Sequence, residues 1–260
     1  MIGIYKKIIV ILLTVIMHSL MFAYSFSPSV ATMSPRGNNS SFIYTVTNQE
    51  DRPIPLEITI YDLIQDINGV RSIGDEVNDD FLVFPAQFIL KKKETRRVQV
   101  RWVGDPDIQI EKAFTVLCKE LKMPAEQSKP DSVDIERTTF GLNILVNYAT
   151  RLMVTPFYGN SEIVIESFDI STNEAGKNEI IIICSNIGNI HDRLLNHSFI
   201  IRPGSDKKQF PEFVPINLNE HDITGMAEVI LAKSSRRFVI PWPEKLPFGK
   251  INVELVKNAK

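Results

Sequence analysis

The side chains that could do chemistry are few in this chain, and the histidines are the first to consider. The sequence contains four of them: His18, His191, His197 and His221. It has no HExxH zinc motif, no GxSxG nucleophile turn, no glycine-rich phosphate loop and no paired cysteines at zinc spacing. His191 and His197 flank an expected turn, where Asp192 alone offers too few ligands for a metal. We therefore expect packed or solvated histidines and no catalytic residue.

Carboxylates gather in two expected loops, as Asp79 and Asp80 and as Asp105 and Asp107. Carboxylates in loops can bind calcium, but they more commonly accept hydrogen bonds that shape turns. The sequence thus predicts no metal, no cofactor and no small-molecule substrate, and an enzyme is the weaker class of function.

Composition points to a globular protein with a substantial core. The chain has 260 residues, of which 44% are hydrophobic and 23% are charged. A formal net charge of -2 and a pI near 6.1 leave no excess of cations for a phosphate backbone. No Lys/Arg cluster is interleaved with aromatic residues, so nucleic acid is not an expected partner.

The first residues have the pattern of a secretory signal peptide. Lys6 and Lys7 precede the apolar run Ile8 to Ile16, and the small residues Ala23 and Ser25 follow. A single anchoring helix is the alternative, but the run is short for a bilayer and His18 interrupts it. We expect residues 1–25 to be removed and the rest to be exported. Export would permit a disulfide, yet Cys118 and Cys184 fall on strands of different expected domains, which favours two buried thiols.

The exported part reads almost entirely as strands and turns. Ile54, Leu56, Ile58 and Ile60 alternate with more polar residues, as in a half-buried antiparallel strand. Phe26 to Met33 is expected to be one short strand. A polar loop is expected to hold Asn68-Gly69 and the acidic stretch from Asp75 to Asp80. About seven strands at this spacing are typical of an immunoglobulin-like sandwich, and a second cycle of strands begins after Pro156. The expected fold is all-β, with domains at 26–155 and 156–260.

The stretch from Leu142 to Arg151 reads as a long strand that runs into the domain boundary. Leu142, Ile144, Val146 and Tyr148 share one parity and project from one face. The opposite face is mixed. Any half-buried strand of a sandwich shows the same alternation, so this pattern alone does not assign a function.

Short segments spread along the chain resemble the PapD-like periplasmic chaperones of pilus and fimbria assembly. These segments are Phe26-Ser27-Pro28, Ser34-Pro35-Arg36-Gly37, Val46-Thr47-Asn48, Phe81-Leu82-Val83-Phe84-Pro85-Ala86-Gln87, Val98-Gln99-Val100-Arg101, Glu111-Lys112-Ala113-Phe114, Leu121-Lys122-Met123-Pro124 and Ser185-Asn186-Ile187-Gly188-Asn189-Ile190-His191. The resemblance implies two immunoglobulin-like β-sandwich domains in an L-shaped arrangement, and a protein of the periplasm.

The resemblance also implies a function and a set of site residues. Leu142, Ile144 and Val146 would lie on a donor strand that completes a pilin or fimbrial subunit lacking its own last strand. An outer-membrane usher would receive the subunit, and unoccupied molecules could associate through the donor strand. Arg151 would anchor the C-terminal carboxylate of the subunit, since a planar guanidinium suits a carboxylate. Glu111 would contribute to the contact between the domains.

This chain departs from the family pattern at two positions. Ala31 stands where the family has a second cleft arginine, and Arg36 lies too far along the strand to replace it. Thr155 stands where the family has an arginine that locks the two domains. The alternative interpretation is an exported two-domain binding or adhesion module without chaperone activity, which would bury Leu142, Ile144 and Val146 in its own core.

Overall fold

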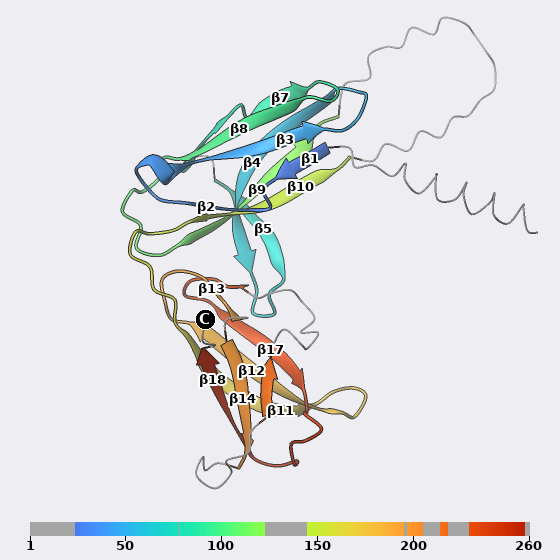
Figure 1. The fold of residues 1–260 in the computed structure, drawn as a ribbon, viewed down its shortest axis with the longest axis vertical. Helices are drawn as coiled ribbons and strands as arrows, with labels where there is room; N and C mark the ends of the chain where they lie inside the picture. Colours follow the sequence, from blue (N-terminus) through green and yellow to red (C-terminus); the bar gives the residue numbers. More distant parts are fainter. Residues whose placement is uncertain are drawn as a thin grey trace, which may run out of the picture.

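The computed structural model describes residues 24–77, 79–122, 145–194, 197–204, 214–217 and 229–257. These residues form an all-β protein, with a three-residue 3-10 turn at Asn38–Ser40 (Figure 1). Within the described ranges, no helix is long and apolar enough to cross a bilayer. Almost all of the expected signal peptide lies outside these ranges, as do Leu142, Ile144 and His221.

The first half of the chain forms a sandwich of two sheets. One sheet has the strand order β1-β3-β8-β6, and the other has the order β2-β10-β9-β4-β5 with β7 also paired to β4. The strands are β1 Tyr24–Ser27, β2 Val30–Met33, β3 Ser41–Asn48, β4 Ile54–Gln65, β5 Arg71–Glu76, β6 Phe81–Phe84, β7 Gln87–Leu90, β8 Thr95–Trp102, β9 Lys112–Glu120 and β10 Asn147–Val154.

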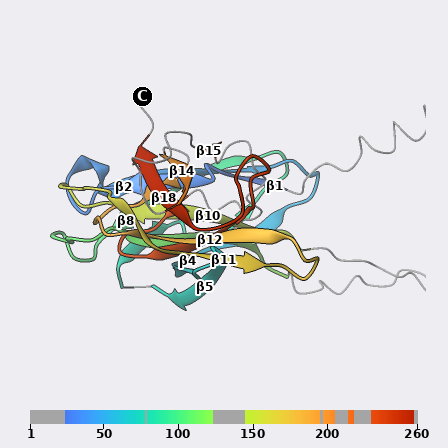
Figure 2. The ribbon, with the colours of Figure 1, turned by 90° about the horizontal axis from the view of Figure 1, so that it is seen from below.

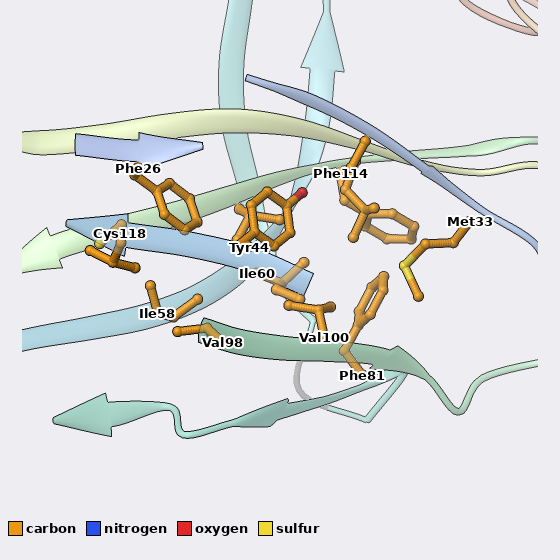
Figure 3. Close-up of a cluster of buried hydrophobic side chains, with 14 of the residues drawn as sticks. Phe26, Met33, Tyr44, Ile58, Ile60, Phe81, Val98, Val100, Phe114 and Cys118 are labelled. Atoms are coloured by element: carbon orange, nitrogen blue, oxygen red, sulfur yellow. The ribbon is translucent and has the colours of Figure 1, made fainter. Parts of the chain in front are cut away.

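Alternating apolar residues from both sheets fill this first sandwich. The inward residues of β4 are buried, as their spacing predicted, and they meet the inward residues of β8 and β9 (Figure 3). Phe81 packs edge-to-face on Phe114 with ring centroids 4.8 Å apart, an arrangement that aromatic rings favour. The core therefore holds the two sheets together through ordinary sandwich packing.

The first strand is divided between the two sheets. β1 pairs with β3, whereas β2 pairs in parallel with β10. Pro28, which has no N–H to donate to a ladder, stands between them. The prediction of one strand from Phe26 to Met33 was therefore wrong. The division matters because β2 reaches only the second half of β10.

The second half forms another set of antiparallel sheets around a separate core. The sheet orders are β11-β12-β17, β13-β16 and β15-β14-β18. The strands are β11 Ile163–Thr172, β12 Asn178–Asn186, β13 Asp192–Arg193, β14 His197–Pro203, β15 Val214–Asn217, β16 Val229–Ile230, β17 Ser235–Pro241 and β18 Ile251–Lys257. Its buried cluster includes Ile180, Ile182, Phe199 and Phe238, and shares no residue with the first cluster.

The expected fold class is confirmed, with two immunoglobulin-like sandwiches in an L-shaped arrangement (Figure 1). Figure 2 views the molecule from below, the side of the second sandwich. The region after Asn68 contains β5 rather than only a polar loop, so that prediction was wrong in part. β4 and β5 form a hairpin that extends from the first sandwich toward β17 of the second (Figure 1).

Candidate functional site

β10 carries one of the predicted site residues, Arg151, and begins directly after another, Val146. One of its edges is partly open. The strand pairs antiparallel with β9 along its whole length, from Asn147 to Val154. Its other edge pairs with β2 only from Arg151 onward. Among the described strands, none pairs with this edge between Asn147 and Thr150. Unpaired backbone groups at such an edge can bind another strand.

Of the three predicted donor side chains, the structure describes Val146 alone. Val146 is half-buried and packs with Tyr148 against the first core. The Tyr148 hydroxyl donates to the Tyr24 carbonyl at 2.6 Å, and the Tyr24 hydroxyl lies 2.8 Å from the Val146 carbonyl. Burial raises the pKa of both tyrosines, so both hydroxyls remain protonated donors. The entry to β10 is thus tied to β1, and the donor role of Leu142, Ile144 and Val146 stays a prediction.

Arg151 lies on the face of β10 opposite to the core. Its neighbours Leu152 and Val154 are buried in the sandwich, whereas Arg151 lines an outer pocket of about 350 Å³. In register it pairs with Val30 on β2 and with Thr115 on β9. Arg151 therefore points away from Val146, which packs against the first core. Its role as an anchor stays a prediction.

Neither Ala31 nor Arg36 places a second positive charge in this pocket. Ala31 is buried in the first core, and its neighbour Val30 lies opposite Arg151. Arg36 forms an ion pair with Asp107 at 3.0 Å and lies over the ring of Phe157. The pocket nevertheless contains a second arginine that sequence reasoning missed, because Arg71 of β5 lines it from the other side.

Glu111 lies between the two sandwiches, and its side chain is 1% exposed. Its Oε2 accepts a hydrogen bond from the Thr155 hydroxyl at 2.8 Å. Its Oε1 accepts one from the His191 backbone N–H at 3.1 Å and lies 2.7 Å from His191 Nδ1. The Glu111 N–H donates to the Asn189 carbonyl at 2.9 Å. A threonine therefore contacts Glu111 at the position where the family resemblance implies an arginine.

A second contact between the sandwiches forms at the tip of the β4–β5 hairpin, and sequence reasoning missed it. The Arg237 N–H donates to the Ile67 carbonyl at 2.7 Å. Arg236 is 2% exposed, and its Nε and Nη1 have no hydrogen-bond partner in the described structure. Burial lowers the pKa of Arg236, Asp66 opposes this shift, and repulsion from Arg71 adds to it. A Cβ on Gly69 would lie 1.3 Å from Arg236 Nη1, so only glycine fits against the guanidinium.

The remaining chemistry-bearing side chains take structural roles. His191 lies against Glu111, and His197 is buried at the start of β14. Asp105 Oδ1 accepts the Asp107 N–H at 2.8 Å, which is a turn contact of the expected kind. Among the described residues, no group of three or more potential ligands could hold a metal ion. His18 and His221 lie outside those residues.

Cys118 and Cys184 are both buried free thiols, one in each sandwich core. Burial raises the pKa of each thiol to about 12. The expected pair of separate buried thiols is confirmed.

The whole described fold can be compared with known proteins. No protein-family model matches the sequence, and no curated protein matches it. Solved structures do match over most of the chain. The fimbrial chaperone CfaA, of class 5, has 17% identity and a TM-score of 0.53, with 89% of this chain and 98% of that chain covered.

Two further matches come from complexes. A chain of a chaperone–tip adhesin complex of CFA/I fimbriae biogenesis has 16% identity and a TM-score of 0.52, with 91% of this chain and 99% of that chain covered. A chain of the CsuC–CsuE chaperone–tip adhesion subunit pre-assembly complex of Acinetobacter baumannii has 13% identity and a TM-score of 0.50, with coverages of 91% and 98%. The chain has the fold of the fimbrial chaperones. At these identities, the likeness shows the fold.

Proposed function

We propose that this protein is a periplasmic chaperone that caps pilin or fimbrial subunits by donor-strand complementation and delivers them to an outer-membrane usher. The observation that supports this most directly is the open edge of β10 between Asn147 and Thr150. The similar chains that come from complexes with tip adhesins share the fold along nearly their whole length. Cleavage of residues 1–25 would release the two proposed domains, 26–155 and 156–260, into the periplasm.

Donation of this edge needs no cofactor and no catalysis. The backbone of the segment leading into β10 supplies ladder hydrogen bonds to the strand-deficient subunit. Leu142, Ile144 and Val146 fill successive apolar pockets of its groove. Burial of each such side chain is worth about 1.5 to 3 kcal/mol, so three together protect an edge that would otherwise aggregate. The chaperone therefore keeps the subunit soluble by covering the subunit's exposed groove.

Arg151 anchors the subunit through its C-terminal carboxylate. The side chain lines the outer pocket at the point where the open edge meets β2. A guanidinium binds a carboxylate through two parallel N–H···O hydrogen bonds, which fixes direction as well as distance. The anchor therefore sets the register of the client strand along β10. When no client is bound, the same edge allows two molecules of this chain to associate.

The experiment is a co-purification from the periplasm, with mass spectrometry of what accompanies the protein. We expect the parent to capture a small strand-deficient subunit, and the triple change of Leu142, Ile144 and Val146 to Ser to lose it. A matched control changes Leu82, Phe84 and Ile89 to Ser, because these exposed apolar side chains lie on β6 and β7, away from β10. The control should capture the subunit as the parent does.

An exported binding or adhesion module is the second candidate, and the packing of Val146 and Tyr148 on the first core favours it. If the triple variant unfolds in urea at much lower concentration than the parent, the three side chains are ordinary core. If the parent captures no subunit, the chaperone function is wrong. Either result would favour the binding or adhesion module over the chaperone.

A further inference from the structure

The outer pocket beside β10 is basic from both sides. Arg151 lines it from β10, and Arg71 lines it from β5, which lies beyond β9 and β4 in the same six-stranded sheet. Hydroxyl groups of Ser72 and Thr115 are also part of the lining, with Ile73 as an apolar wall. Among the described lining residues none is acidic. Two guanidinium groups in the wall of one cavity give it the charge that attracts an anion.

The backbone around the pocket indicates which kind of anion would reach it. A strand added to the open edge of β10 would lie beside Asn147 to Thr150. It must stop at Arg151, because the Arg151 N–H already donates to the Ser29 carbonyl at 3.0 Å and β2 occupies the edge from Val30 onward. An added strand that runs parallel to β10, as β2 does, therefore ends beside the pocket. Its C-terminus carries a carboxylate, whereas the N-terminus of an antiparallel strand would bring a cation.

We propose that Arg71 is a client-binding residue that forms, together with Arg151, a two-arginine pocket for the C-terminal carboxylate of the captured subunit. This inference rests on the proposed function and adds a residue to its anchor. The second cation comes from the β4–β5 hairpin instead of the first strand, where Ala31 is buried. The hairpin also contacts β17 through Ile67 and Arg237, so the anchor is built on an element that joins the two sandwiches.

The pocket can be tested without knowing the client, by using sodium butanoate as a probe of the carboxylate site. The arginine Nε–H signals of the exported chain are followed by NMR at constant ionic strength, with neutral butanamide as the control ligand. We expect saturable shifts of both Arg71 and Arg151 with butanoate and none with butanamide. Arg71→Gln should weaken binding roughly tenfold, since a charge-assisted hydrogen bond is lost, and Arg71→Lys should restore part of it.

Arg97→Gln is the matched variant, because Arg97 is an exposed arginine on β8 in the other sheet. It should leave butanoate binding unchanged. A response confined to Arg151, or an unchanged affinity in Arg71→Gln, would overturn the role of Arg71.

The link to the client is tested by the same co-purification. Arg71→Gln and Arg151→Gln should each reduce the captured subunit, whereas Arg97→Gln should not. Full capture by Arg71→Gln, despite lost butanoate binding, would overturn the client assignment. A parent that binds butanoate through both arginines but captures no subunit would show that the pocket is real and the chaperone function wrong. The two failures are thus distinguishable.

Discussion

At the scale of single residues, Glu111 shows how a buried carboxylate can join two domains. Burial of an unpaired charge is costly, and it becomes tolerable when donors surround both oxygens. The donors here are the hydroxyl of Thr155 and the backbone and ring of His191. Thr155 directly follows β10 of the first sandwich, and His191 directly precedes β13 of the second. Glu111 is therefore placed to hold the second sandwich against the first.

Replacing Glu111 with Ala should lower the free energy of unfolding by about 1–3 kcal/mol, because the buried donors of Thr155 and His191 lose their acceptor. Urea unfolding followed by circular dichroism measures this loss. Glu174→Ala removes an exposed glutamate from the turn between β11 and β12 and should change stability by less than about 0.5 kcal/mol. Equal losses in the two variants would contradict the role given to Glu111.

At the scale of elements, the β4–β5 hairpin connects the six-stranded sheet of the first sandwich to the second sandwich. It turns at Asn68-Gly69, where Gly69 has a φ of +84° that glycine adopts without strain. The same glycine leaves room for the Arg236 guanidinium. Arg71, which lines the proposed anchor pocket, follows two residues later on β5. One short hairpin therefore sets both a domain contact and a wall of the pocket.

We expect Gly69→Ala to loosen the contact between the sandwiches. The new methyl group must displace the buried Arg236 side chain, and the positive φ adds strain. Amide hydrogen exchange at Arg237 should become faster, because its N–H bonds to Ile67 across this contact.

Gly176→Ala is the control for backbone strain alone, since Gly176 has a φ of +74° and open space around its Cβ position. It should cost about 1–2 kcal/mol of stability and leave exchange at Arg237 unchanged. Faster exchange in both variants, or in neither, would argue against a contact made through Gly69.

At the scale of the whole molecule, each sandwich core contains one buried thiol that resists ionisation. Both thiols have pKa values raised from 9.0 to about 12, and Tyr44 in the first core has a pKa raised from 10.0 to about 12. Because the folded pKa is the higher one, this stabilisation is complete below the unfolded pKa. It is lost as pH rises through the folded pKa.

The protein should therefore lose stability progressively between about pH 9 and pH 12, in both sandwiches. Urea midpoints measured across that range give the size of the loss. The double variant Cys118→Ala, Cys184→Ala should lose less stability over this range than the parent. If parent and variant decline identically, ionisation of the thiols is not the cause.

The amino-acid sequence by itself determined the all-β class, the two sandwiches and the inward face of strands such as β4. These features follow from the alternation of apolar and polar residues along each strand, which can be read from the sequence as a period of two. It also contained a signal for β5, since Asn-Gly between strand-like segments is a hairpin turn, but the acidic residues nearby favoured a loop.

Tertiary structure alone decided which residues meet. The division of the first strand at Pro28 leaves half of the β10 edge open, and strand pairing between distant segments brings Arg71 and Arg151 to one pocket. The burial of Arg236 against Gly69 depends likewise on how two separately packed cores face each other. Contacts of this kind join residues far apart in the chain, so no local pattern records them, and only the packed sheets bring them together.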